Sequence, residues 1–386
     1  MSSNPEFSFV LPCLNEVRTI KACVNKCRLS ADQHGLDIEI VLADNGSTDG
    51  SIELAESLGC RVVRVKKKGY GSALISGIKS ARGKYVIMGD ADDSYDFSDI
   101  EEFVVGLRKG ADIVIGNRMK GGVLPGAMPA LHRYLGNPVL SFLGRIFYNT
   151  KIGDFHCGLR GFNRKKILSL NLKCSGMEFA SEMLCKAVIH EFNIIETPIK
   201  LYPDGRDRAP HLRSWRDGWR HLRFLLIHSP NWLFIYPGLV LALLGLIGGT
   251  AIMRAPVELG AITLDVNTML YFATAFLLGL QMLSLGCFTK IFHHRLYTPH
   301  KPMPFLASFT LEKGVIIGGI LIALGVIGSL LSVGNWQTAH FGDLDPRAIL
   351  RQVIPSATAI MAGGLLVVNA FTLGVIESLT DLDAEN

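Results

Sequence analysis

Four carboxylates lie within seven consecutive positions of the sequence, directly after a short apolar run. The run, residues 85–88, is bounded by a lysine and a glycine and predicts a buried parallel strand. Asp90 and Asp92 follow it, and residues spaced in this way point to the same side of an extended tripeptide. Such a pair suits a hard divalent cation, Mg²⁺ or Mn²⁺, that also holds a diphosphate. The alternative is an acidic loop in which Asp96 or Ser98 caps the next helix.

Polar residues or glycines also follow three other expected strands. Glu16 comes after the first and can accept a ribose hydroxyl, whereas Asp44 comes after the second and can accept a ribose hydroxyl or a base N–H. Gly69 and Gly71 follow the third and allow a nucleotide close to the backbone, with lysines nearby for phosphate charge. Each segment alone is also typical of a turn or a helix start. Because parallel strands end at one edge of a sheet, the four segments are expected to meet in one crevice.

The elements that must hold these residues alternate between short apolar runs and segments of helix length. The apolar runs are residues 7–11, 38–43, 61–65, 85–88 and 112–115. This alternation predicts an α/β fold with a Rossmann-like, mostly parallel sheet and helices on both faces.

The second half of the chain has a different composition, because charged residues become sparse after about residue 223. Four mainly apolar segments, each about twenty residues long, are expected to span a membrane core of about 30 Å: residues 232–253, 268–291, 314–333 and 353–376. The polar first residues predict no signal peptide. The connection between the second and third segments is basic, which predicts that this loop, both termini and the N-terminal domain face the cytoplasm.

Charge and amphipathic patterns indicate contact with the membrane surface. The formal net charge of +5 suits anionic headgroups. The sequence contains no visible basic-aromatic module, so nucleic-acid binding is not expected. Residues 212–231 combine arginines with an apolar stripe that contains Trp215 and Trp219, which predicts a basic helix in the headgroup layer. A second predicted helix, residues 138–148, has an apolar face that is either interfacial or part of the core.

Taken together, the motifs resemble those of family 2 inverting glycosyltransferases with the GT-A fold. The matching segments are Leu11-Pro12-x-x-Asn15-Glu16, residues 44–51, residues 69–73 and Asp90-Ala91-Asp92. Over about residues 7–230 the chain is similar to dolichyl- or polyprenyl-phosphate hexose synthases. The resemblance implies that Asp90 and Asp92 hold the metal and the diphosphate. It also implies that Pro12, Glu16 and Asp44 bind the nucleoside.

A later segment, residues 154–162, also resembles a family segment, in which an aspartate lies near the sugar. Asp154 therefore joins Asp90 and Asp92 as a candidate catalytic residue. One departure concerns the metal: mannose synthases of the family commonly have Gln two places after the metal-binding Asp, where this chain has Asp93-Ser94.

The resemblance implies hexosyl transfer, with inversion and with Mg²⁺ or Mn²⁺, from a nucleotide sugar to a polyprenyl or dolichyl phosphate. Glucose on UDP is the expected donor, and mannosyl and N-acetylhexosaminyl transfer are the alternatives. A lipid monophosphate has a second pKa of about 6, so it already carries nucleophilic charge and needs no general base. Candidate arginines for this phosphate are Arg118, Arg133, Arg206 and Arg208.

We therefore expect a cytosolic GT-A domain at residues 1–211, the interfacial helix at 212–231, a four-helix transmembrane domain at 232–376 and an acidic cytosolic tail at 377–386. A homo-oligomer remains open. A processive polysaccharide synthase is an alternative, but the Gln-x-x-Arg-Trp motif expected of it is missing. A non-enzymatic membrane scaffold is another alternative, which the intact acidic and nucleotide motifs disfavour.

Overall fold

The computed structural model describes residues 4–206, 214–297 and 310–382. By its internal contacts the chain divides into two compact units, residues 1–228 and 229–386, and each is described by itself. Arg208 lies outside the described residues, so its role stays a prediction.

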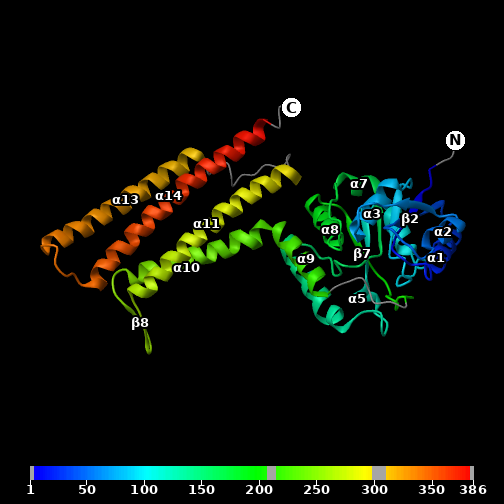
Figure 1. The fold of residues 1–386 in the computed structure, drawn as a ribbon, viewed down its shortest axis with the longest axis horizontal. Coiled ribbons are helices and arrows are strands. Elements are labelled where there is room, and N and C mark those ends of the chain that lie inside the picture. Colours follow the sequence, from blue (N-terminus) through cyan, green and yellow to red (C-terminus); the bar gives the residue numbers. More distant parts are fainter. Residues whose placement is uncertain (1–3, 207–213, 298–309, 383–386) are drawn as a thin grey trace. The chain divides into compact units, whose positions relative to one another are not determined.

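A mixed sheet forms the centre of the first unit (Figure 1). Its described strands run in the order β3-β2-β1-β4-β6-β5-β7. The strands are β1 (Phe7–Cys13), β2 (Ile38–Asp44), β3 (Arg61–Arg64), β4 (Tyr85–Met88), β5 (Ile113–Asn117), β6 (Arg160–Asn163) and β7 (Ile194–Pro198). Neighbours pair in parallel except at β6, which runs antiparallel to β4 and β5. The prediction of a mostly parallel sheet is confirmed.

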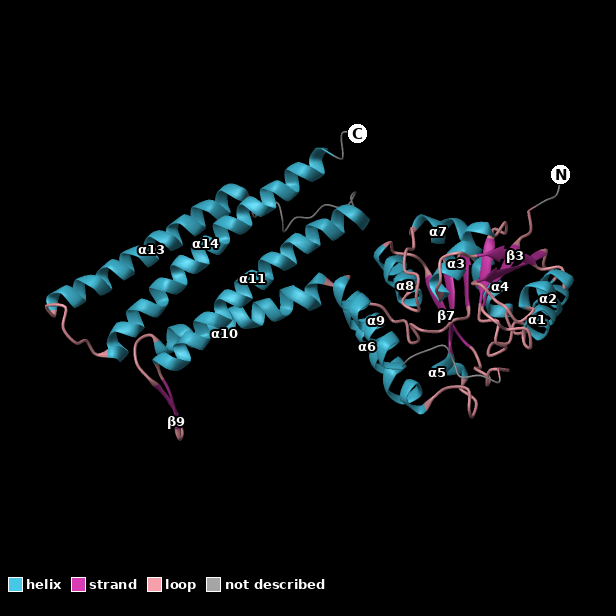
Figure 2. Cartoon of the chain, viewed as in Figure 1, coloured by secondary structure: helices cyan, strands magenta, loops and turns pink. Residues whose placement is uncertain are grey.

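Helices cover both faces of this sheet, as predicted (Figure 2). Successive residues of a strand point to opposite faces, so Phe9 and Val10 of β1 belong to different core clusters. Phe9 shares its cluster with residues of α1 (Ile20–His34), α2 (Ser51–Ser57) and α4 (Glu101–Arg108). Val10 shares the other with residues of α3 (Tyr70–Ser80), α7 (Arg164–Ser169) and α8 (Phe179–Ile189).

The sequence did not predict β6 and β7, because neither strand contains a continuous apolar run. β6 begins with Arg160, whose guanidinium is completely buried. It donates hydrogen bonds to the carbonyl oxygens of Phe155, Cys157 and Ala180 at 2.8–2.9 Å. A charged side chain thus occupies a core position that a hydrophobicity pattern assigns to the surface.

Two helices of the first unit leave apolar side chains exposed. α9 (Ser214–Ile227) corresponds to the predicted basic helix; it buries His221 and Leu225, whereas Trp215 and Trp219 are 82% and 58% exposed. The helix at residues 138–148 is also present, as α6 (Asn137–Tyr148), and follows η1 (His132–Gly136). Several apolar residues of α6 are exposed: Val139, Phe142 and Ile146. The placement of α6 and α9 in a membrane surface stays a prediction.

Among the described residues, the second unit contains four helices long and apolar enough to cross a membrane, as predicted. The candidate spans are Asn231–Ile252, Val266–His294, Leu311–Thr338 and Pro346–Ile376. The first span consists of η2 (Asn231–Ile235) and α10 (Tyr236–Ile252), and the other three belong to α11 (Val266–Tyr297), α13 (Leu311–Thr338) and α14 (Pro346–Leu382). A hairpin of β8 (Val257–Leu259) and β9 (Ile262–Leu264) follows α10. Glycines allow α13 and α14 to touch, since a Cβ on Gly318 would lie 2.7 Å from the carbonyl oxygen of Gly363.

Candidate active site

The predicted acidic pair follows the C-terminal end of β4, at the edge of the sheet where ligands bind in open α/β folds. Asp92 is buried, and both of its carboxylate oxygens have protein partners. Its Oδ1 accepts hydrogen bonds from the N–H and Oγ of Ser94 at 3.1 and 2.6 Å. Its Oδ2 lies 3.0 Å from Nη1 of Arg206. The next residue, Asp93, pairs instead with Lys26 at 2.8 Å, so the two residues that depart from the family pattern are both engaged with protein groups.

Asp90 lies beside Asp92, and its ionised form is less favoured by the surrounding protein groups than that of an ordinary aspartate. Burial and the neighbouring charge of Asp92 raise the pKa of Asp90 well above its ordinary value. A hydrogen bond from Tyr70 and the charges of Arg206 and Arg118 act in the opposite direction without cancelling this shift. A carboxyl group next to a second carboxylate is stabilised in its ionised form by a cation placed between them.

Arg206 connects the acidic pair to Glu16. Glu16 is buried after β1, and its carboxylate oxygens lie 2.9 and 3.0 Å from Nε of Arg206. Nη2 of the same guanidinium is 2.7 Å from Oε1 of Glu16, while Nη1 reaches Asp92. The sequence placed Arg206 on the acceptor side. Its contacts in the structure are with residues expected on the donor side.

The two other predicted nucleoside-binding residues lie on adjacent strands. Pro12 belongs to β1 and Asp44 ends β2, which pairs with β1 in parallel register. The Asp44 carboxylate accepts backbone N–H groups from Gly46 at 2.8 Å and from Ser47 at 3.1 Å. The hydroxyl of Ser47 in turn accepts the N–H of Asn15 at 2.8 Å. The loops after β1 and β2 are therefore tied together, as a common nucleoside site requires.

Gly71 makes a close approach, but to another part of the protein. A Cβ on Gly71 would lie 2.2 Å from the carbonyl oxygen of Cys174 and 2.9 Å from that of Gly176. The next residue, Ser72, donates its N–H to the carbonyl oxygen of Ser175 at 3.2 Å. The glycine thus lets α3 pack against residues 174–176, and its contact with a nucleotide stays a prediction.

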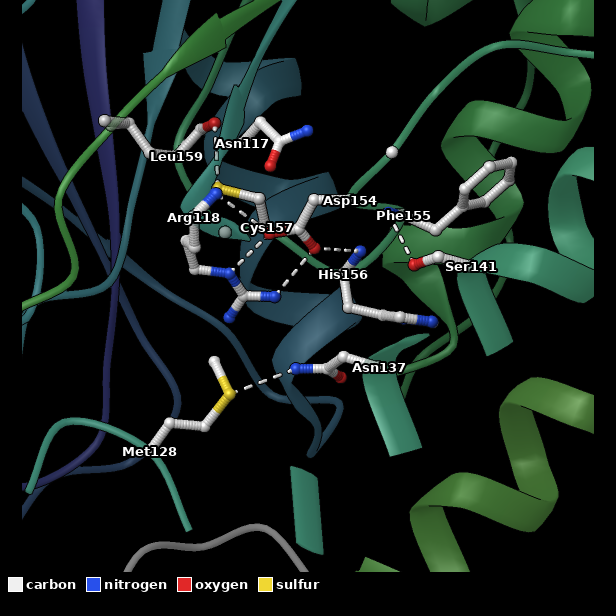
Figure 3. Close-up of polar contacts among 12 residues, drawn as sticks. Asn117, Arg118, Met128, Asn137, Ser141, Asp154, Phe155, His156, Cys157 and Leu159 are labelled. Carbon is white, nitrogen blue, oxygen red and sulfur yellow. Dashed lines mark hydrogen bonds and ion pairs between the residues drawn. The ribbon is translucent and has the colours of Figure 1, made fainter. Parts of the chain in front are cut away.

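Arg118 and Asp154 form a buried ion pair (Figure 3). Nε and Nη2 of Arg118 donate to Oδ2 and Oδ1 of Asp154 at 2.7 and 2.9 Å, and the Arg118 N–H donates to Oδ2 at 3.2 Å. Burial alone would raise the pKa of Asp154, but the charge and hydrogen bonds of Arg118 lower it below its ordinary value. Asp154 therefore orients Arg118, and its expected place beside the sugar stays a prediction.

Arg133 lies in η1, directly after His132, and its place on the acceptor side stays a prediction. Its guanidinium is 5.4 Å from the centre of the Tyr134 ring. Burial lowers the pKa of the neighbouring His132, and the charge of Arg118 lowers it further. The charges of Arg206 and Arg118 both act to lower the pKa of Asp90, and Arg206 also contacts Asp92 directly.

Two histidines that the sequence did not single out pack beside the loop of Asp154. The ring of His156 contacts the ring of His221 from α9 edge to face, with centroids 4.6 Å apart. Nδ1 of His221 lies 2.8 Å from Oγ of Ser181. Burial lowers the pKa of His221 to about 4 and that of His156 well below its ordinary value. These residues lie too far apart in sequence to form a recognisable motif.

We expect the first unit to become less stable as the pH falls from about 6.5 towards about 4. In this range an unfolded His221 binds a proton that the folded, buried side chain does not, so acidification favours unfolding. His221→Asn can keep a hydrogen bond to Ser181 and should reduce the loss of melting temperature between about pH 7 and pH 5. His34→Asn, on the outer helix α1, is the control. Equal losses in His221→Asn and wild type would contradict the prediction.

The acidic pair fits a divalent cation whose coordination is completed by its substrate. Among the described residues, no group of three or more His, Cys, Asp or Glu side chains could hold a metal ion by itself. Asp90 and Asp92 supply two carboxylates, and Mg²⁺ is commonly bound by one or two carboxylates together with substrate phosphates. A metal that enters with a diphosphate therefore fits these residues.

Comparison with protein families identifies two matching regions. Residues 8–169 match the family described as glycosyl transferase family 2. Residues 287–377 match the glycosyltransferase family 2 C-terminal transmembrane region. The first match contains the β4 acidic pair and the Arg118–Asp154 ion pair.

Several known proteins are similar to this chain. The low-salt glycan biosynthesis hexosyltransferase Agl6 of Haloferax volcanii is 34% identical over 373 residues, which cover 96% of this chain and 89% of Agl6. A dolichyl-phosphate hexose transferase of the same organism is 28% identical over 161 residues, 42% of this chain and 68% of that protein. Glucosyl-3-phosphoglycerate synthase from Mycobacterium tuberculosis, solved with Mn²⁺ and UDP, is 20% identical with a TM-score of 0.44 and covers 58% of this chain and 78% of that one.

Proposed function

Since this chain belongs to glycosyltransferase family 2 and is an integral membrane enzyme, we propose that it transfers a hexosyl group from a nucleoside diphosphate sugar to a polyprenyl or dolichyl monophosphate. The observation that carries the proposal is the acidic pair after β4, whose Asp92 is joined to Glu16 through Arg206 and whose Asp90 is within the electrostatic influence of Arg118. The near full-length similarity to a hexosyltransferase supports the type of sugar. The basic loop before α13 supports a catalytic unit on the cytoplasmic side.

The donor occupies the side of the site formed by the loops after β1, β2 and β4. Pro12, Glu16 and Asp44 take the nucleoside, while Asp90 and Asp92 face the diphosphate with the metal. When bound, Mg²⁺ or Mn²⁺ would neutralise charge on the departing nucleoside diphosphate. We assign Arg206 to this side as well, because its guanidinium is already held between Glu16 and Asp92. A diphosphate can replace the carboxylates as its partner.

The acceptor phosphate occupies the other side, near Arg118 and Arg133. A guanidinium binds phosphate oxygens through paired N–H groups, and Arg118 is held rigidly by Asp154. The phosphate is its own nucleophile, so these side chains need only hold its oxygen in line with the anomeric carbon. Exposed apolar side chains on α6 and α9 suit a lipid surface, where the polyprenyl chain would remain.

For the donor we propose UDP-glucose, with inversion at the anomeric carbon. The test uses full-length protein in membranes, a panel of nucleotide sugars, and polyprenyl phosphate added or omitted. We expect glucosyl-lipid formation that requires both substrates and stops in EDTA. Transfer from a mannose or N-acetylhexosamine donor would change the sugar but keep the reaction. Polymer formation without lipid phosphate, or no transfer from any donor, would overturn the proposal.

A further inference from the structure

The carboxylate of Glu196 binds three hydrogen-bond donors and one ammonium group. Glu196 lies on β7, and its side chain is 10% exposed. Its Oε1 accepts the backbone N–H groups of Gly153 and Asp154 at 2.6 and 3.0 Å, and Nδ2 of Asn117 at 3.1 Å. Its Oε2 lies 3.2 Å from Nζ of Lys120. Hydrogen bonds to an ionised acceptor are about twice as strong as those between neutral groups.

These contacts hold both chain segments that carry the Arg118–Asp154 ion pair. Asn117 directly precedes Arg118, and its Oδ1 caps α5 (Arg118–Gly121) by accepting the N–H of Lys120 at 2.9 Å. Gly153 directly precedes Asp154, and a Cβ on it would lie 2.6 Å from Nδ2 of Asn117. Glu196 therefore fixes the backbone on each side of the ion pair.

We propose that Glu196 is a positioning residue for the acceptor side of the site. It holds the Asp154 backbone, Asp154 holds the guanidinium of Arg118, and Arg118 binds the acceptor phosphate. The inference rests on the proposed function, because it requires Arg118 to bind the acceptor. A purely structural role would instead affect folding, or affect donor and acceptor use alike.

Glu182 provides a matched control. Its carboxylate also accepts two backbone N–H groups, from Lys173 and Cys174 at 3.0 and 2.7 Å, and pairs with Lys186 at 2.8 Å. The segment that it holds packs against Gly71 instead of carrying the Arg118–Asp154 pair. Loss of this carboxylate therefore removes a similar set of contacts at another place.

The experiment compares Glu196→Ala, Glu196→Gln and Glu182→Gln in the full-length protein. Glu196→Ala should raise the KM for the lipid phosphate about 10-fold or more, with kcat and the donor KM nearly unchanged. Glu196→Gln keeps one acceptor oxygen and should raise the acceptor KM only about 3-fold. Glu182→Gln should leave the acceptor KM at its wild-type value. Equal changes in donor and acceptor KM, or an acceptor effect in Glu182→Gln, would overturn the inference.

Amide hydrogen exchange provides a readout that needs no substrate. Glu196→Ala should speed the exchange of the Gly153 and Asp154 amides without affecting Lys173 and Cys174. Unchanged exchange would overturn the inference. Should Glu196→Ala fail to fold, Glu196→Gln decides the question, and an acceptor KM equal to wild type overturns it. If the wild type uses another acceptor, the proposed function fails, and the same KM comparison is made with the acceptor that it does use.

Discussion

Replacing Asp92 by Asn is expected to reduce hexosyl transfer by about 100-fold or more while the protein remains folded. Asn has nearly the same shape and keeps an oxygen that can accept the hydrogen bonds from Ser94. It lacks the negative charge that, with Asp90, would hold a divalent cation on the diphosphate. Glu16 still pairs with Arg206, so the loss of Asp92 leaves that guanidinium with a partner.

Asp93→Asn is the matched control for this experiment. Asp93 is the adjacent carboxylate, but it pairs with Lys26 of α1 and its side chain is 28% exposed. Its removal should change transfer by less than about 3-fold, because a partly exposed ion pair contributes little. The measurements are transfer rates at several Mg²⁺ and Mn²⁺ concentrations and the melting temperature of each variant. Full wild-type activity in EDTA, or equal losses in the two variants, would disprove the assignment.

The fold could largely be predicted because its signals are local. The strands β1 to β5 each contain a short apolar run, and the membrane helices are recognised by length and composition alone. The strands β6 and β7 were missed because charged side chains, the buried Arg160 and the half-buried Glu196, interrupt their apolar character. Each of them has a hydrogen-bond partner at least 20 positions away along the chain, which a sequence pattern does not reveal.

The residues of the candidate site that directly follow strands could be predicted from the sequence. Asp90, Asp92, Glu16 and Asp44 lie near the end of the strand that each was expected to follow. The arginines could not be sorted by sequence, since a guanidinium suits the phosphates of donor and acceptor equally. Only the fold pairs Arg206 with Glu16, 190 positions away along the chain. Likewise, nothing local reveals that Asp154 is engaged by Arg118.

The proposed placement of the arginines, Arg133 at the acceptor and Arg206 at the donor, predicts opposite effects for two substitutions. Arg133→Ala should lower kcat/KM for the lipid phosphate about 10- to 100-fold and leave donor affinity unchanged. The reason is that a charge-assisted hydrogen bond contributes about 1.5–3 kcal/mol. Arg206→Ala should instead weaken nucleotide-sugar affinity or the departure of the diphosphate, with little change in the dependence on lipid concentration. Donor affinity and lipid-dependent turnover, measured for both variants, separate these outcomes.

Arg220→Ala is the control, because this arginine lies on α9 and its ion pair in the described part of the chain is with Asp217, at 3.4 Å, and not with the acidic pair. Its loss should mainly weaken association of the first unit with anionic membranes and leave donor affinity intact. If Arg133→Ala lowers donor affinity while the dependence on lipid concentration is unchanged, Arg133 belongs to the diphosphate and the acceptor site is misplaced. If Arg206→Ala changes only the lipid dependence, the sequence-based placement on the acceptor side is right. The pairing with Glu16 and Asp92 would then describe only the enzyme without its substrates.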